Sequence, residues 1–109
     1  MPLEKTIQAD IVKYLNKMEG CHVWKNHGGA YTNAGVPDVI GVYKGKFLGI
    51  EVKQPKKKGN VTRLQGEFIN KLNDCGGISF VATCIGDVEE KLELNNDINE
   101  VPWAFRVIG

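Results

Sequence analysis

The sequence has no apolar run longer than a strand, and its first residues, MPLEKTIQADIVKYL, mix charged side chains among the apolar ones. A membrane-spanning helix needs about 20 consecutive apolar residues, and a secretory signal peptide needs an uninterrupted apolar stretch. Neither pattern occurs, so the sequence predicts a soluble, intracellular protein. Its length of 109 residues favours a single domain, residues 1–109, with one hydrophobic core.

Cysteine and histidine are scarce. The three cysteines, Cys21, Cys75 and Cys84, are an odd number with no close pair, and both histidines, His22 and His27, lie near only the first of them. This spacing argues against a disulfide framework and against a structural zinc site. We expect the cysteines to be small buried hydrophobic residues in a reducing compartment.

The net charge is only +1, but the charges are unevenly distributed. Residues 44–63 hold six lysines and one arginine against one acid, whereas residues 87–100 hold six acids against one lysine. We therefore expect one end of the molecule to be basic and the other acidic, which can orient a polyanion. The alternative for the PKKKG stretch is an ordinary solvated loop.

Helical spacing of apolar residues predicts an amphipathic helix over residues 3–18. Thr62 followed by Gln65 is a capping-box pattern, which predicts a second helix ending at the glycines 76–77. A short acidic helix is predicted for the stretch GDVEEKLEL. The second helix should bury a stripe formed by Leu64, Phe68, Ile69 and Leu72.

Strands are predicted at residues 21–25, 38–43, 46–53 and 78–84. The stretches GGAYTNAGVP and QPKKKGN are rich in turn-forming residues and should be loops. The resulting order, α-β-β-β-α-β-α, indicates an α/β fold with a mixed sheet, and the second helix should make a right-handed parallel crossover. The segment WAFRVI is ambiguous, either an edge strand or a segment that packs on a partner.

The short turn Lys44-Gly45 determines which side chains of the central hairpin face one another. Counting outward from a two-residue turn places Asp38 opposite Glu51, with Cβ atoms roughly 5 Å apart on one face. Lys53, two residues beyond Glu51, points the same way. A three-residue turn would shift the register by one and separate these groups.

Two carboxylates held this close repel each other unless a cation lies between them. Mg²⁺ is the natural candidate, since it commonly uses one or two carboxylates and several waters. Such an ion can activate water and neutralise a phosphate, while Lys53 could orient or deprotonate the attacking water or stabilise developing charge. The alternative is an exposed hairpin face with a Lys–Glu pair of little energetic value.

The order PD, short hairpin, EVK resembles the PD-(D/E)xK nuclease superfamily, and the fuller pattern is similar to its virus-type replication-repair nuclease (VRR-NUC) domain. That pattern includes an early helix opening with a Glu, the segment VWKNHGGAYTNAGVPD, the strand GIEVK and a glutamine early in the next helix. The likeness runs from about Glu4 through the strand at 78–84. It implies a restriction-endonuclease-like core and a Mg²⁺- or Mn²⁺-dependent endonuclease that hydrolyses DNA phosphodiester bonds.

The resemblance also implies roles for individual residues. Glu4 matches an acid that completes the metal site in related nucleases; alternatively, it is simply a favourable acid in the first turn of a helix. Gln65 resembles a glutamine close to the active site, which is compatible with its capping role. The remaining implied site positions are the metal-binding carboxylates Asp38 and Glu51, the metal-binding main-chain carbonyl of Val52, and the catalytic Lys53.

Donors for phosphate oxygens occur in the loop before Asp38 and in the basic loop after Lys53. The expected DNA contacts are Lys25, Asn26, His27, Tyr31, Asn33, Lys56, Lys57, Lys58 and Arg63. The alternative is that these are ordinary surface loops. Lys53 is preferred to His27 as the general base, and Trp24 and Trp103 are expected in the core or an interface.

Stand-alone, virus-encoded members of the family resemble Holliday-junction resolvases and act as homodimers. The resemblance therefore implies structure-selective cleavage of branched DNA by a phage-encoded homodimer in the host cytoplasm, with a dimer surface on the sheet edge or the PWAFRVIG tail. Alternatives are a less selective, flap-directed, restriction-like or RNA-directed nuclease, or a binding module that does not cut. The presence of all three residues Asp38, Glu51 and Lys53 favours activity.

Overall fold

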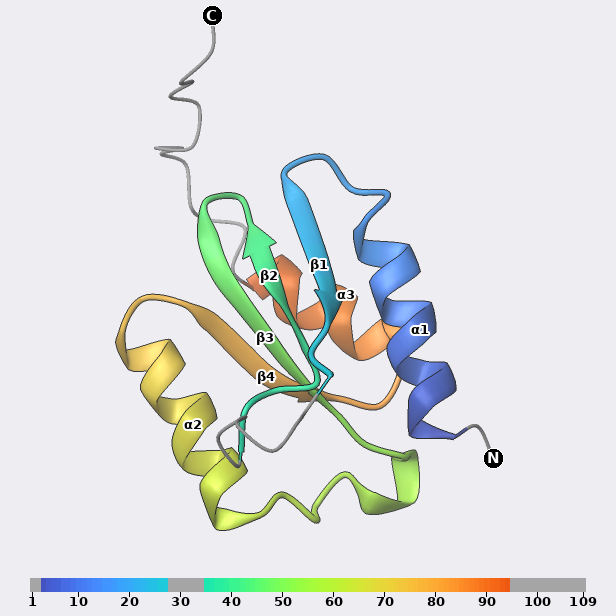
Figure 1. Cartoon of the computed structure of the whole chain (residues 1–109), viewed down its shortest axis with the longest axis vertical. Helices are drawn as coiled ribbons and strands as arrows, with labels where there is room; N and C mark the ends of the chain where they lie inside the picture. Colours follow the sequence, from blue (N-terminus) through green and yellow to red (C-terminus); the bar gives the residue numbers. More distant parts are fainter. Residues whose placement is uncertain (1–2, 28–34, 95–109) are drawn as a thin grey trace, which may run out of the picture.

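The computed structural model describes residues 3–27 and 35–94, which form a mixed sheet flanked by helices (Figure 1). The order α-β-β-β-α-β-α is the predicted one, with a short 3₁₀ helix, η1, added after the third strand. The segment WAFRVI, which the sequence leaves ambiguous, lies outside the described residues. The elements are α1 (Glu4–Leu15), β1 (Cys21–Lys25), β2 (Val39–Tyr43), β3 (Lys46–Val52), η1 (Pro55–Lys57), α2 (Arg63–Asp74), β4 (Ile78–Ala82) and α3 (Ile85–Leu94).

The four strands lie in the order β1-β2-β3-β4. The first three are antiparallel, and β4 runs parallel to β3, which confirms the predicted parallel crossover through α2. Helices α1 and α3 pack together on one face of the sheet, while α2 packs on β3 and β4 from the other face (Figure 1). Both flanking layers therefore meet at β3, the strand that carries Glu51.

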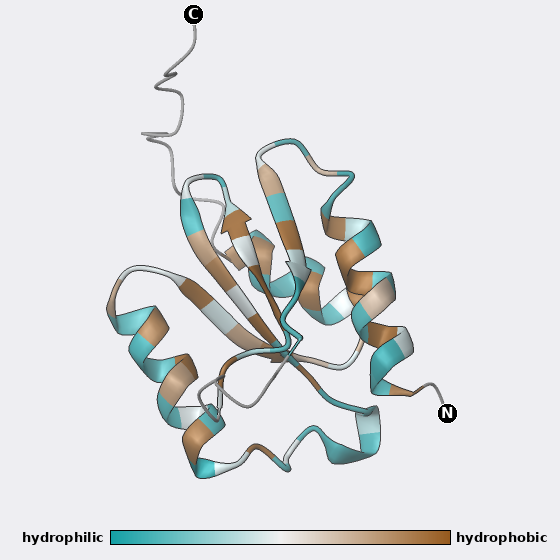
Figure 2. Ribbon diagram, viewed as in Figure 1, coloured by the Kyte–Doolittle hydropathy of each residue, from teal (hydrophilic) through white to brown (hydrophobic). Residues whose placement is uncertain are grey.

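The hydrophobic core lies between the sheet and the pair α1 and α3. Apolar side chains alternate along the strands toward this layer, as expected for strands with one face on a core. Burying each large apolar side chain contributes roughly 1.5–3 kcal/mol. The core consists of Ile7, Ile11, Leu15, Val23, Val39, Tyr43, Leu48, Ile50, Val52, Ile78, Phe80, Ala82, Val88 and Leu92. By contrast, the loop after β3 is mostly hydrophilic (Figure 2).

The β2–β3 hairpin has the predicted two-residue turn. Lys44 and Gly45 both have positive φ, 48° and 83°, as the tight hairpin turn that matches strand twist requires. Tyr43 pairs with Lys46, and Val39 pairs with Ile50, so the predicted register is confirmed. The strand begins at Val39, one residue later than predicted.

Helix α2 begins with the predicted capping box at Thr62 and ends beside Gly76, whose φ is 93°. The predicted buried stripe is wrong at Leu64, which is 53% exposed. Helix α2 packs on β3 and β4, and its first turn lies beside Glu51 and Gly35. Phe68 is half-buried, as are Ile69 and Leu72.

The expectation that all cysteines are buried is also wrong. Cys75 and Cys84 are exposed, because one follows the end of α2 and the other directly precedes α3. Cys21 is half-buried, and burial raises the pKa of its thiol to about 11. In the part of the chain that the structure describes, no helix is long and apolar enough to span a bilayer.

Candidate active site

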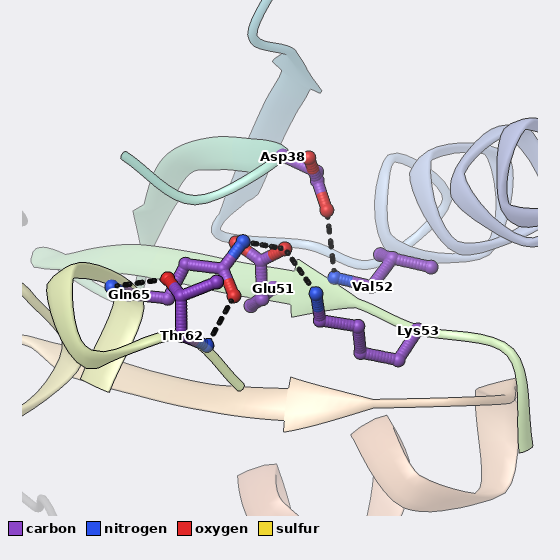
Figure 3. Close-up of polar contacts among 6 residues, drawn as sticks. All are labelled: Asp38, Glu51, Val52, Lys53, Thr62 and Gln65. Atoms are coloured by element: carbon purple, nitrogen blue, oxygen red, sulfur yellow. Dashed lines mark hydrogen bonds and ion pairs between the residues drawn. The ribbon is translucent and has the colours of Figure 1, made fainter. Parts of the chain in front are cut away.

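Asp38 directly precedes β2, and its carboxylate reaches across to β3. Its Oδ2 accepts a hydrogen bond from the backbone N–H of Val52 at 2.9 Å (Figure 3). Asn26 holds Asp38 from the other side: its N–H donates to the Asp38 carbonyl at 2.7 Å, and its Nδ2 donates to the Pro37 carbonyl at 3.3 Å. Asn26, predicted to contact DNA, thus has its side-chain amide engaged in positioning the turn into β2.

Glu51 is a buried carboxyl, with only 3% of its surface exposed. Its Oε2 lies 3.2 Å from Gln65 Nε2, which donates to it, and 3.9 Å from Lys53 Nζ. Burial raises the pKa of Glu51 to about 8; the charges of Asp38 and Glu4 act in the same direction, and Lys53 opposes them. A cation bound beside Glu51 would favour its charged form and so lower this pKa.

Lys53 follows the last residue of β3 and stays attached to the sheet. Its backbone N–H donates to the Ala82 carbonyl at 3.0 Å, which continues the β3–β4 pairing beyond the strand. Its side chain is 13% exposed and reaches back toward Glu51 (Figure 3). The ammonium is therefore held at the mouth of the carboxylate pair, where it can donate to an anionic group.

The donor set fits a hard divalent cation. Because the N–H and C=O of a strand residue point to the same side, the carbonyl of Val52 opens toward Asp38. Two carboxylates, a carbonyl and waters are the ligands that Mg²⁺ uses. Within residues 3–27 and 35–94, no three His, Cys, Asp or Glu side chains gather into a metal-binding cluster. Glu4 raises the pKa of Glu51, and its role as a ligand stays a prediction.

The predicted DNA contacts surround the site unevenly. Lys25 is half-buried at the end of β1, and His27 is exposed. The lysines at positions 56–58 are exposed on and after η1, in the loop that starts directly after Lys53. Arg63 is exposed and forms an ion pair with Glu67, with 2.8 Å between Nε and Oε1. Tyr31 and Asn33 lie outside the described residues.

Two other expectations concern the surface. The basic and acidic segments are not fully separated, because Lys58 Nζ lies 3.7 Å from Asp87 Oδ1 at the start of the acidic segment. Residues 95–100 of the acidic segment lie outside the described residues. The crossover through α2 brings the start of α3 back beside the basic loop. Trp24 was expected in the core or an interface, and its 48% exposure on β1 leaves only the interface. Trp103 lies outside the described residues.

Gly35 is a structural feature of the site that we did not predict from the sequence. Its φ is 91°, and a Cβ placed on it would lie 2.7 Å from the carbonyl oxygen of Leu64. The segment leading to Asp38 therefore packs directly on the first turn of α2, which only glycine permits. The one available signal was a glycine immediately before the sequence VPD.

Comparisons with known proteins bear on the family and the fold. The family model of the archaeal Holliday junction resolvase (Hjc) matches residues 5–97. A solved structure described as a VRR_NUC domain protein is similar at a TM-score of 0.61 and 22% sequence identity, covering 84% of this chain and 86% of that one. No curated protein matches. The structural match confirms the predicted nuclease-type fold.

Proposed function

Because the chain belongs to the archaeal Holliday junction resolvase family, we propose that it is a divalent-metal-dependent endonuclease that cuts branched DNA as a homodimer. The observation that supports this proposal best is the meeting of Asp38 and Glu51 beside the backbone of Val52, at the open end of the hairpin. Both are acidic, one is buried, and a lysine lies next to them. This is the donor set expected where a phosphate must be approached by a metal and by a protonated amine.

Each side chain has a separate task in the proposed reaction. Asp38, Glu51 and the Val52 carbonyl would hold the cation, which supplies charge neutralisation at the phosphate and activation of a water molecule. Lys53 would donate a hydrogen bond to a phosphate oxygen and so stabilise the charge that develops during cleavage. Gln65 holds Oε2 of Glu51 and thereby orients the carboxylate.

The loop after Lys53 provides the proposed path for the DNA backbone. It holds Lys56, Lys57 and Lys58, which are all exposed, and it starts where the reacting phosphate would lie. Lysine contacts of this kind bind phosphates independently of sequence and position the duplex. Recognition of branched DNA by shape is consistent with such contacts.

The proposed homodimer uses the open face of the sheet, defined here as Trp24, Val42 and Phe47. These side chains are 48%, 46% and 41% exposed, and they lie on the same face of the sheet as α2, in the part that α2 does not cover. Edge-to-edge pairing is less suitable. The Asn16 side-chain amide accepts from the backbone N–H of Val23 on β1 at 2.8 Å and donates to its C=O at 2.9 Å. The Asn73 amide binds the backbone N–H and C=O of Ser79 on β4 in the same way, at 2.8 and 2.9 Å. These backbone groups at the sheet edges are therefore already hydrogen-bonded. The tail PWAFRVIG, the other predicted dimer surface, lies outside the described residues.

A cleavage assay on a four-way junction, a flap and a linear duplex tests the proposal directly. Wild-type protein should cut the junction preferentially with Mg²⁺ or Mn²⁺ and not with EDTA, leaving paired cuts across the junction. Lys53→Ala and Asp38→Asn should each reduce cutting by at least about 100-fold while binding persists, since both act on the reacting centre.

Three outcomes would contradict parts of this proposal. Variants that cut as well as wild type would reject the site. A wild-type protein that binds junctions but cuts none of the three substrates with either metal would be a binding module. A monomer at micromolar concentration in sedimentation experiments would reject the homodimer.

A further inference from the structure

Gln65 connects Glu51 to the N-terminal cap of α2. Its Nε2 donates to Glu51 Oε2 at 3.2 Å, while its Oε1 accepts the backbone N–H of Thr62 at 3.0 Å (Figure 3). The Thr62 hydroxyl in turn accepts the backbone N–H of Gln65 at 3.1 Å. The same three bonds therefore begin a helix and hold a buried carboxyl.

These bonds permit only one orientation of the Gln65 amide. A backbone N–H can only donate, so the amide oxygen must face Thr62. The amide nitrogen is then left facing Glu51, whatever the protonation state of that carboxyl. If the amide turned over, its nitrogen would meet the N–H of Thr62, and two donors would face each other.

The first turn of α2 is also fixed from the opposite side. Gly35 packs against the carbonyl of Leu64 so closely that an added Cβ would lie 2.7 Å from that oxygen. Gly35 belongs to the segment that leads into Asp38. The first turn of α2 thus makes short contacts both with Glu51 and with the segment that leads into Asp38, although these come from three different parts of the chain.

From this geometry we infer that Thr62 is a positioning residue: it acts through Gln65 to hold the Glu51 carboxylate toward Asp38. The functional meaning of this inference rests on the proposed metal-dependent nuclease activity. Thr62 itself is exposed and touches no reacting group. Without its hydroxyl the first turn of α2 loosens, the Gln65 amide is no longer held, and Glu51 loses its donor.

The first test uses NMR on the metal-free protein and needs no enzyme activity. The side-chain amide of Gln65 should exchange slowly with water and show a distinct chemical shift in wild type and in Thr62→Ser. In Thr62→Ala it should move toward the values of an exposed glutamine. A Gln65 amide that is unchanged in Thr62→Ala would overturn the inference.

The control must weaken α2 without touching its cap. Asn70→Gly combined with Lys71→Gly changes two exposed positions farther along α2, and urea unfolding shows whether its stability loss matches that of Thr62→Ala. The control should leave the Gln65 amide as in wild type. If it changes the amide as much as Thr62→Ala does, then Thr62 is only a structural cap.

The second test measures Mn²⁺ affinity by calorimetry, together with kcat and KM for junction cleavage. We expect Thr62→Ala to bind Mn²⁺ roughly three- to tenfold more weakly and to lower kcat more than it raises KM. Loss of a direct partner of a metal ligand usually costs about 10- to 100-fold, and Thr62 acts on Glu51 only through Gln65. Thr62→Ser should recover to within about twofold of wild type. Equal losses in Thr62→Ala and the control would overturn the inference.

The two tests separate this inference from the proposed function. If wild type cuts no DNA but the Gln65 amide responds as expected, the positioning role stands and the nuclease proposal fails. If wild type cuts junctions and Thr62→Ala matches wild type in amide exchange and Mn²⁺ affinity, the positioning role fails and the nuclease proposal stands.

Discussion

The site is built from two regions that contribute in different ways, the β2–β3 hairpin and the first turn of α2. The hairpin brings Asp38 and Glu51 together through the register set by a two-residue turn. The helix brings Gln65 to Glu51 from 14 positions farther along the chain. The hairpin thus supplies the charged groups, and the helix turn supplies their orientation. Local pairing is sufficient for the first, whereas the second requires the tertiary fold.

Shifting the hairpin register should have the largest effect. Inserting one glycine between Lys44 and Gly45 should slip the pairing by one residue and send the side chains of one strand to the opposite face. Junction cleavage should then fall by at least about 100-fold, with a clear loss of thermal stability. A cleavage assay measures the first effect, and thermal unfolding measures the loss of stability.

The matched control for the insertion is one glycine added after Gly59. This position is exposed, and a Cβ there would contact nothing within 4 Å. The control should retain most of the stability of wild type. Comparable cleavage and stability in both insertion variants would show that the hairpin register does not determine the site.

The pH dependence of stability should be the next largest effect, and it tests the buried charge itself. The pKa of Glu51 is raised in the folded state, to about 8 from an ordinary 4.5. Its contribution to stability is therefore fully present below about pH 4.5 and is lost as pH rises toward 8. Metal-free protein should lose on the order of 3 kcal/mol of unfolding free energy between pH 5 and pH 8 from this group.

Urea unfolding of wild type and Glu51→Gln at several pH values measures this contribution. The variant should lack the decline, because a neutral amide replaces the carboxyl. Glu67→Gln, on the exposed side of α2, should behave as wild type does. A parallel decline in wild type and Glu51→Gln would show that Glu51 is not the group responsible.

Gly35→Ala should have a smaller effect, and it tests the contact between the two regions. The positive φ of Gly35 and its approach to Leu64 both disfavour a side chain, so we expect a loss of about 1–2 kcal/mol in unfolding free energy. Cleavage should also fall several-fold because Asp38 and α2 separate. Gly59→Ala, where no positive φ and no neighbour oppose a Cβ, is the matched control and should be close to neutral.

Sequence patterns predicted well wherever neighbouring residues decide the structure. The capping box at Thr62 and the hairpin turn depend on bonds between residues a few positions apart, and both predictions are confirmed. The burial of Leu64 was predicted from helical periodicity alone and is wrong. Periodicity identifies an apolar stripe, but it does not say how far the underlying sheet extends beneath it.

The two segments of opposite charge show the same limit. Their separation along the chain suggested separation in space, yet the crossover through α2 returns the chain so that Lys58 meets Asp87. All three cysteines were expected in the core, and the two that lie beside helix ends, Cys75 and Cys84, are exposed. In each case the outcome depended on packing between segments that are distant in sequence.

By itself, the sequence determined that Asp38, Glu51 and Lys53 gather at one end of a hairpin, because strand periodicity and turn length are local properties. Only the tertiary structure decided that Glu51 is buried, that Asn26 holds Asp38 instead of remaining free, and that Gln65 presents its nitrogen to the site. The physical reason is that burial and side-chain hydrogen bonding depend on which distant segments surround a group, and no pattern of neighbouring residues specifies them.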